Sequence, residues 1–510
     1  MKQYIKSILI LIAGLCLFHL FSTLQVYMSN TELSGLLKII EKTDFLLMPN
    51  SFIMATLDSF SVAFAGGVFF TLTVGTLVVL ISFGAAVIYY KNSEFKSFLS
   101  WVYIALLFQI CLIINIDGLC LIESLSCVVV PLFVFFLYGF FFGRRHNGLA
   151  PEKIAVHFIP VLFLAIVLMV TSLISNQSMF SDFRDSFLMS NKTGMTINNF
   201  YYKYTLYPAR VFKPYAMQIP RVCSVETETE TPKVKRIRKR LADVDYLVIP
   251  PEVAGTFVPD IKVRISGADV FLQHRGKTVV TTTVKSFISR PWKDLERFSK
   301  ETDRYYNYRR LTSFALKSGF PLYMYILMHF LLCLFIRLLL SAFVIKDKSA
   351  LIASVCCFVI GCMAFMLMYN GSQFEITRKT LASSLKSQNV RERIAGLKFA
   401  ASEELDMSKY SEYDTRFIDN YIPEKYWYAR AAGTSTDIAT VRTLIKLLDD
   451  QHPNVACQAL YGLGLKNNKS VVNLIIEKIN KSENWYVQWY AYRALKRLKW
   501  TQRTNYLKKR

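Results

Sequence analysis

Seven apolar stretches dominate the sequence, and each is long enough to cross a lipid bilayer. A helix needs about 20 mainly apolar residues to span the hydrocarbon core. The stretches are Ser7–Val26, Ser61–Tyr90, Phe98–Ile116, Leu119–Phe142, Ile154–Ile174, Phe320–Ile345 and Ala350–Tyr369. Composition agrees, because 53% of the 510 residues are hydrophobic and only 19% are charged, whereas soluble chains carry about a quarter charged residues. The sequence predicts a mainly α, polytopic membrane protein with about seven spans.

Basic residues in the short loops set the expected orientation, because such loops stay in the cytoplasm. They precede the first stretch and follow the second, fourth and sixth: Lys2, Lys6, Lys91, Lys96, Arg144, Arg145, Lys153, Lys346 and Lys348. The N-terminus is therefore expected in the cytoplasm, and the first outer loop at 27–60. An odd number of spans places the C-terminus in the periplasm of a bacterial-type inner (plasma) membrane. The first stretch lacks a small-x-small cleavage site, so an uncleaved anchor is favoured over a signal peptide.

The long segment 175–319 is expected to form a small outer loop domain that contains β-structure. Val270–Gln273 and Thr278–Val284 flank a polar turn and predict a β-hairpin. Pro291–Lys317 is charged and aromatic, which predicts one amphipathic helix leading into the sixth span. The Glu/Thr alternation at 226–230 indicates an exposed strand or an extended linker. The basic run 233–240 leaves two alternatives, a solvated linker or a contact with lipid headgroups or a partner.

The C-terminal quarter carries the strongest repeat signal. Val455 and Val487 begin similar segments 32 residues apart, and Val390 begins a third copy. The last two copies each follow an apolar helix with i, i+3, i+4, i+7 spacing, at 441–448 and 471–479. Paired helices of this kind bury their apolar faces by stacking on their neighbours. The pattern predicts an α-solenoid over 371–510.

This region resembles the short HEAT repeats of the phycobilisome-lyase type, whose second helix carries a Val-Arg-x-x-Ala-x-x-Ala-Leu-Gly pattern. The matching positions are Val455, Ala459, Gly462, Leu463 and Gly464, then Val487, Ala491, Ala494 and Leu495. The first copy departs from the pattern at Ile394, and the copy at 427–432 departs further. The resemblance implies a solenoid that binds protein. It does not imply lyase activity.

Aromatic residues gather in the later repeats and supply the candidate partner-binding site. The candidates are Trp427, Tyr428, Arg430, Trp485, Tyr486, Trp489 and Tyr492. Such residues dominate interface hot spots, but they also fill ordinary helical cores. Packing within or between repeats therefore stays open beside a binding face.

Sequence motifs for chemistry are scarce. The six histidines are scattered without metal-ligand spacing, and no phosphate-binding glycine loop occurs. The layout of five helices and an outer domain is similar to that of lipoteichoic-acid synthases and phosphoethanolamine transferases. However, the loop is far shorter and holds a single histidine, His274. We therefore expect no cofactor, and an enzyme is the less favoured interpretation. A disulfide between Cys223 and Cys457 is left open.

Arg337 is the one strongly charged residue deep in an apolar stretch, within the sixth span. Intramembrane charge is typical of transport paths, but a long arginine also snorkels to the membrane surface. The net charge of +24 fits anionic lipid, and nucleic acid is not an expected partner on the outer side.

These observations predict four regions: a five-helix membrane region at 1–174, the loop domain at 175–319, two more membrane helices at 320–370, and the solenoid at 371–510. The favoured function is an inner-membrane scaffold or assembly factor whose periplasmic repeats bind a partner protein. One alternative is a component that transports or exports lipid, glycan or ion. Another is an enzyme acting on a lipid-linked substrate at the outer face, near Glu41, Asp44 and Asp58.

Overall fold

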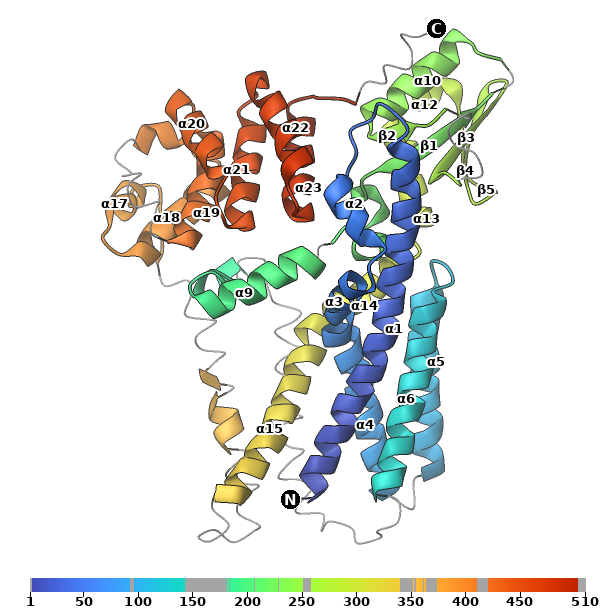
Figure 1. Cartoon of the computed structure of the whole chain (residues 1–510), viewed down its shortest axis with the longest axis vertical. Coiled ribbons are helices and arrows are strands. Elements are labelled where there is room, and N and C mark those ends of the chain that lie inside the picture. The colour runs from blue at the N-terminus through green and yellow to red at the C-terminus, as the bar shows by residue number, and fades with distance from the viewer. Residues whose placement is uncertain are drawn as a thin grey trace. The chain divides into compact units, whose positions relative to one another are not determined.

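The computed structural model of the chain describes residues 2–91, 96–142, 181–182, 184–205, 207–227, 229–250, 258–339, 352, 355–360, 362–363, 374–410 and 421–502. Contacts group the chain into two compact units. We call residues 1–28, 60–180 and 303–370 the bundle unit, and residues 29–59, 181–302 and 371–510 the repeat unit. Helices dominate the described chain, and the mixed sheet belongs to the repeat unit (Figure 1).

Long apolar helices build the bundle unit. Its main elements are α1 (Lys2–Ile40, as far as residue 28), α3 (Phe60–Phe70), the π-helical turn η1 (Thr71–Gly75), α4 (Thr76–Lys91), α5 (Lys96–Asn115), α6 (Leu121–Phe142), α14 (Tyr306–Lys317) and α15 (Gly319–Leu339). In the described part of the chain, four helical stretches are long and apolar enough to cross a membrane. They are Gln3–Ile40, Phe60–Tyr90, Leu121–Phe142 and Tyr306–Ile336.

The prediction of about seven spans is therefore not supported. The predicted span 98–116 coincides with α5, of which the described stretch Ser100–Asn115 is a shorter apolar helix. The predicted span 154–174 lies outside the described residues, as does most of 350–369. The predicted outer loop at 27–60 begins as a helix, because α1 continues to Ile40. Leu33, Leu36, Leu37 and Ile40 give that extension one buried face with helical spacing.

Glycines bring the helices of the bundle unit close together. A Cβ on Gly75 would lie 2.7 Å from the ring of Phe18, and one on Gly67 would lie 2.9 Å from the backbone nitrogen of Thr23. Neither site has room for a side chain, so α1 packs directly on the backbone of α3 and η1.

A five-stranded mixed sheet forms one part of the repeat unit, in the order β2-β1-β3-β4-β5. The strands are β1 (Arg221–Glu226), β2 (Tyr246–Val248), β3 (Ile261–Ser266), β4 (Asp269–His274) and β5 (Lys277–Thr283). β1 pairs in parallel with β2 and β3, while β3, β4 and β5 form an antiparallel meander. The hairpin expected from the sequence is β4–β5, and its turn residues Arg275 and Gly276 both have positive φ.

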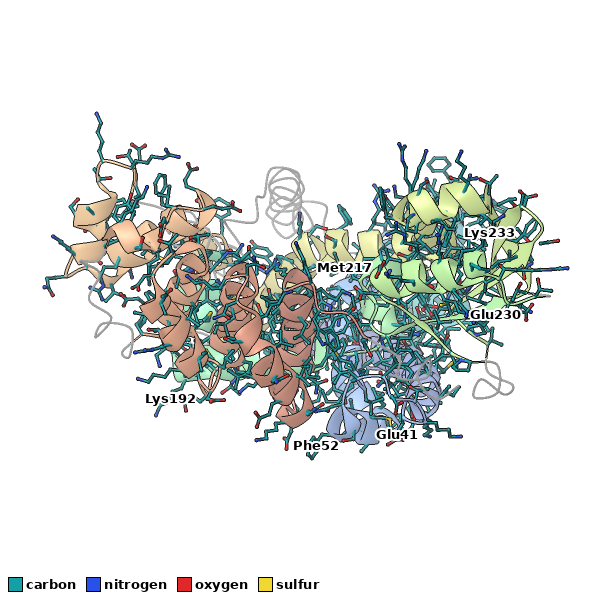
Figure 2. The ribbon with its side chains drawn as sticks, turned by 90° about the horizontal axis from the view of Figure 1, so that it is seen from above. Glu41, Phe52, Lys192, Met217, Glu230 and Lys233 are labelled. Carbon is teal, nitrogen blue, oxygen red and sulfur yellow. The ribbon has the colours of Figure 1, made fainter. Side chains whose placement is uncertain are left out.

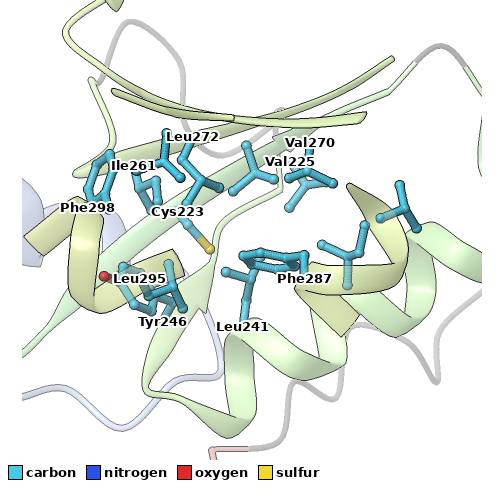
Figure 3. Packing of buried hydrophobic residues seen from close by; sticks show 14 of the residues in the cluster. Cys223, Val225, Leu241, Tyr246, Ile261, Val270, Leu272, Phe287, Leu295 and Phe298 are labelled. Carbon is cyan, nitrogen blue, oxygen red and sulfur yellow. The ribbon is translucent and has the colours of Figure 1, made fainter. Parts of the chain in front are cut away.

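The helices α10 (Pro232–Asp243), α12 (Val284–Ser289) and α13 (Pro291–Thr302) complete the hydrophobic core of this sheet. Figure 3 shows Leu241, Phe287 and Leu295 from these helices facing Cys223 and Leu272 of the strands. The predicted single helix 291–317 is instead α13 and α14, which belong to different units.

The basic run is a helix, so the prediction of a linker at 233–240 is wrong. Thr231 caps α10 by accepting a hydrogen bond from the Val234 backbone nitrogen, and proline occupies the first turn. Val234, Ile237 and Leu241 are buried at positions i, i+3 and i+7. Because these residues share one face of α10, the basic residues lie on the outer face. Lys233 lies on that exposed surface (Figure 2).

The helical repeats form the other part of the repeat unit. Their helices are α17 (Leu381–Lys386), α18 (Val390–Ser402), α19 (Ile422–Ala431), α20 (Ile438–Leu447), α21 (Pro453–Leu465), α22 (Val472–Lys481) and α23 (Trp485–Arg497). Asn389, Asp437 and Asn484 cap three of them with side-chain oxygens. At Gly462 a Cβ would lie 2.8 Å from the Ala429 carbonyl oxygen, so α19 and α21 touch through backbone.

The repeat unit also contains shorter helices, some from earlier parts of the chain and some between the repeat helices. They are α2 (Ser51–Leu57), the π-turns η2 (Arg184–Leu188) and η3 (Tyr201–Thr205), α9 (Lys192–Phe200), and the 3-10 turns η4 (Arg210–Phe212), η5 (Tyr215–Met217), η7 (Met407–Tyr410), η9 (Ala432–Thr434) and η10 (Lys469–Val471).

Candidate protein-binding surface of the helical repeats

The predicted binding residues lie on two helices of the solenoid. Trp427, Tyr428 and Arg430 belong to α19, and the other four, at 485, 486, 489 and 492, belong to α23. The structure does not bring them to one open face. Tyr428, Trp485 and Tyr492 are buried, and segments of the same unit cover several of the others.

The segment 182–188 covers the aromatic residues of α19. The Trp427 indole nitrogen donates to Asp185 Oδ2 at 2.7 Å, and the Arg184 guanidinium carbon lies 4.0 Å from the centre of the Tyr426 ring. Asp185 also pairs with Arg184 at 2.7 Å and with Lys398 at 2.8 Å. Both members of the Arg184–Asp185 pair are buried. The segment therefore packs against α19 as part of the interior of the repeat unit.

The helical stretch 192–205 covers part of α21 and α23. Asn198 Nδ2 donates to Asn454 Oδ1 at 3.0 Å, and the rings of Tyr202 and Tyr486 lie 4.6 Å apart. Burial raises the pKa of the Tyr486 hydroxyl well above its usual value, as expected in a dry aromatic contact. Lys192, at the start of α9, stays exposed (Figure 2).

Asn50 ties the loop before α2 to the last repeat. Its side-chain nitrogen donates to the carbonyl oxygens of Ile479 at 2.9 Å, Asn480 at 3.0 Å and Ser482 at 2.9 Å. Its backbone nitrogen donates to Gln488 Oε1 at 3.0 Å. One buried amide therefore satisfies carbonyl oxygens at the end of α22, and Gln488 Nε2 of α23 also donates to the Ser482 carbonyl, at 2.7 Å.

Two further contacts use the remaining aromatic residues of α23. Lys213 Nζ lies 4.3 Å from the Trp485 ring centre and 5.8 Å from that of Trp489, and desolvation lowers the pKa of this lysine to about 7. The Tyr492 hydroxyl donates to Asp245 Oδ1 at 3.1 Å, and Lys496 pairs with the same carboxylate.

The surface that stays open lies at the C-terminal ends of α19, α21 and α23. Arg430, Tyr461, Trp489 and Arg497 are partly exposed there, and Arg493 is exposed. Sequence reasoning selected two of these residues and missed Tyr461, Arg493 and Arg497. A signal was present, because Trp489, Arg493 and Arg497 are spaced i, i+4 and i+8 on one helix face.

A shallow groove of about 280 Å³ opens at the other, N-terminal, ends of α21 and α23. Its lining includes Lys203, Asp450, Pro453, Lys478 and Asn484. Lys478 pairs with Asp449 at 2.9 Å, and Asp450 pairs with Lys425 at 3.0 Å. The charges around this groove are thus largely neutralised within the chain.

The remaining predicted sites are the intramembrane arginine, the cysteine pair and the acidic residues of the first outer loop. Arg337 lies in α15, but its side chain falls outside the described residues. Cys223 and Cys457 are both free thiols, each buried in a different core of the repeat unit, so no disulfide joins them. Asp58 accepts from Ser34 at 2.9 Å and lies 3.6 Å from Lys38. The described residues contain no group of three or more potential metal ligands.

A buried polar cluster lies inside the bundle unit. Glu123 of α6 is only 4% exposed, and it accepts a hydrogen bond from the Gln25 side-chain nitrogen. Gln25 Oε1 in turn accepts from the Tyr308 hydroxyl at 3.4 Å. Glu123 forms no ion pair with any described residue. Its hydrogen-bond partner Gln25 is uncharged, and Arg304 is a positive charge near enough to act on it. A buried acidic side chain in an apolar helix bundle is a functional candidate.

Comparison with known proteins identifies the class of the C-terminal region. Residues 441–510 match the family model of HEAT repeats. This match confirms the predicted HEAT-like repeats and suggests a protein-interaction scaffold. No curated protein and no solved structure matches the chain.

Proposed function

We propose that this protein is a membrane-anchored scaffold or assembly factor whose HEAT-like repeats bind a partner protein. The match to HEAT repeats over 441–510 carries the proposal, since such repeats commonly mediate protein–protein interaction. The open arginine- and tyrosine-containing surface at the ends of α19, α21 and α23 supports it, because Arg, Tyr and Trp dominate interface hot spots.

Membrane insertion is part of this proposal, with about seven spans in a bacterial-type inner membrane. The four long apolar helices support it, and so does the outer face of α6. There Leu132, Phe136 and Phe140 repeat at i, i+4 and i+8 and are 64%, 67% and 71% exposed. Such a stripe is costly in water and is favourable against lipid.

We further propose that the N-terminus is cytoplasmic and the repeats periplasmic, following the basic short loops. C-terminal fusions test this orientation. Alkaline phosphatase after Arg510 should be active, whereas green fluorescent protein exported by the general secretion route should stay dark. The reverse pattern would place the repeats in the cytoplasm and contradict an odd number of spans.

The partner itself is tested by site-specific photocrosslinking in the full chain. A benzophenone side chain replaces Ile438, which is 78% exposed on α20, or Arg493 on α23. Trp292 of α13, 59% exposed, is the matched control outside the repeats. We expect a discrete adduct with one protein from a repeat position and none from position 292. Absence of adducts from every exposed repeat position would contradict a scaffold.

The buried Glu123 cluster favours a second candidate function, transport of an ion, lipid or glycan through the bundle unit. Glu123→Gln and Arg337→Leu test it in a strain that depends on this chain. If the bundle only anchors the repeats, both variants should complement fully. Loss of complementation with normal folding would favour transport.

A further inference from the structure

Arginine and aromatic side chains alternate across three helices that pack side by side, α19, α21 and α23, at the open end of the repeats. The Arg430 guanidinium carbon on α19 lies 5.8 Å from the ring centre of Trp427 and 5.1 Å from that of Tyr461 on α21. The Arg497 guanidinium carbon on α23 lies 4.0 Å from the same Tyr461 ring. We call Arg430, Tyr461, Arg493 and Arg497 the arginine ladder.

Helix packing fixes the ladder in place. Gly464 has no room for a Cβ, which would lie 3.0 Å from Ala494 Cα and 3.3 Å from Arg497 Cδ. The missing side chain lets α23 approach α21 and lets the Arg497 stem pass toward Tyr461. Arg493 lies one turn earlier on α23, with its guanidinium carbon 4.6 Å from the Trp489 ring centre. Aromatic rings therefore restrain all three guanidinium groups before any ligand arrives.

The positive charge of the ladder is not neutralised by any described residue. Buried arginines elsewhere in the repeat unit have carboxylate partners: Arg393 with Glu424, Arg184 with Asp185, and Arg210 with Asp260. Arg430, Arg493 and Arg497 have no such partner within the described chain, and no described group accepts a hydrogen bond from them. Arg430 and Arg497 also lie in the last turns of their helices, where the helix dipole favours cations.

We propose that the arginine ladder binds an acidic segment of a partner protein. Side-chain carboxylates on that segment would accept paired N–H bonds from the guanidinium edges that the rings leave free. The rings already restrain the guanidinium groups, so these groups lose little conformational entropy when a ligand binds. More of the interaction energy of each contact then contributes to the affinity. The inference rests on the proposed scaffold function and names the chemistry of its partner.

The probe for this inference is fluorescein-labelled poly-L-glutamate of about 20 residues. Its binding to the purified full chain is measured by fluorescence anisotropy, with poly-L-glutamine as the uncharged control. The ladder variant is Arg430→Gln/Arg493→Gln/Arg497→Gln. The matched control is Arg442→Gln/Lys446→Gln/Lys469→Gln, which removes the same charge from exposed positions of the same repeats.

We expect the ladder variant to bind poly-L-glutamate at least about tenfold more weakly, because charge-assisted contacts are lost. The matched control should stay within about twofold, since rim charges contribute little at equilibrium. Equal weakening in both variants, or in neither, overturns the proposal. If polyphosphate or phosphatidylglycerol vesicles bind through the same arginines more tightly than poly-L-glutamate does, the proposal of a carboxylate-bearing partner is overturned.

Two further variants keep the result interpretable. Arg493→Gln alone changes an exposed side chain, so it tests the ladder if the triple variant fails to fold. The three Arg→Lys substitutions keep the charge but lose the planar fork, and should still weaken binding. If the ladder variant keeps its photocrosslinked partner, this inference fails while the scaffold function stands. If no repeat position yields an adduct, the function fails as well.

Discussion

Local hydroxyl bonds within one helix recur in the bundle unit beside its long-range Gln25–Glu123 and Gln25–Tyr308 bonds, whereas the docked segments of the repeat unit rely on bonds between distant residues. In the bundle unit, hydroxyl groups bond back one turn along their own helix: Thr71 to the Gly67 carbonyl at 2.9 Å, Thr76 to Leu72 at 3.0 Å and Ser82 to Val78 at 2.6 Å. In the repeat unit, Trp427 bonds Asp185 across 242 residues, and Asn50 bonds Ile479 across 429.

The proposed membrane insertion of the bundle unit accounts for this difference. A helix in an apolar environment must satisfy its polar groups within itself or against a close neighbour. A repeat helix shares its interior with the next repeat and with any segment that docks on it. Removing one long-range contact in the repeat unit should therefore lower the free energy of unfolding more than removing one local hydrogen bond in the bundle unit.

The largest effect is expected at the buried Arg393–Glu424 pair, whose two N···O distances are 2.7 and 3.1 Å. Glu424→Ala leaves a buried guanidinium without its carboxylate and should lower the free energy of unfolding by about 3–5 kcal/mol. Glu477→Ala, at the exposed Lys481–Glu477 pair, is the control, and it should leave the free energy of unfolding nearly unchanged. Urea unfolding followed by tryptophan fluorescence measures both, since five of the six tryptophans belong to the repeat unit.

Asn50→Ala sharpens the comparison, because it removes the donor to three carbonyl oxygens at the end of α22. The Ser482 carbonyl keeps its Gln488 donor, but the Ile479 and Asn480 carbonyls lose this bond, which should cost about 2–3 kcal/mol of unfolding free energy. Asn473→Ala, exposed on the same helix, should stay within about 0.5 kcal/mol of the parent. Limited proteolysis near residue 50 provides a second measurement, and an unchanged cleavage rate would show that the loop is not held by this amide.

Lys213 makes the stability of the repeat unit depend on pH. Its pKa is about 7 in the folded chain and about 10.4 when unfolded. Between these values the unfolded chain binds more protons, so the free energy of unfolding should rise with pH from about 7 to about 10. Lys213→Met should remove that slope and stabilise the chain at pH 7 by no more than about 2 kcal/mol. An identical slope in the variant would exclude Lys213 as its source.

The smallest effect is expected at Thr71 in the bundle unit. Thr71→Val removes the bond to the Gly67 carbonyl and the 2.8 Å contact with His19 Nδ1. We expect a loss of about 1 kcal/mol, measured as faster amide hydrogen exchange in peptides from 60–90. A loss as large as that of Glu424→Ala would break the comparison between the units.

Several elements could be predicted because their determinants are local. The hairpin β4–β5 followed from alternating residues around a turn, and α20 to α23 followed from helical spacing and the 32-residue period. Local signals gave a wrong prediction where two of them indicated different structures for the same segment. The basic run of α10 indicated a solvated linker, yet Val234, Ile237 and Leu241 had the spacing of a helix that packs on a sheet.

The candidate binding residues also show what local sequence signals can and cannot predict. Their position on α19 and α23 followed from the repeat pattern, but their exposure did not. Tyr492 is buried beside Asp245, and Trp485 packs under Lys213, because segments from distant parts of the chain dock there. Arg497 became a candidate only through its 4.0 Å contact with Tyr461 of another helix.

The sequence by itself determined the apolar helices, the strand-rich stretch and the HEAT-like repeats, because hydrophobic periodicity acts within one helix or strand. Tertiary structure alone decided which faces of the repeats are occupied by residues 46–58 and 182–213 and which stay open. Those contacts join residues hundreds of positions apart, and their energy depends on shape and charge that meet only after folding.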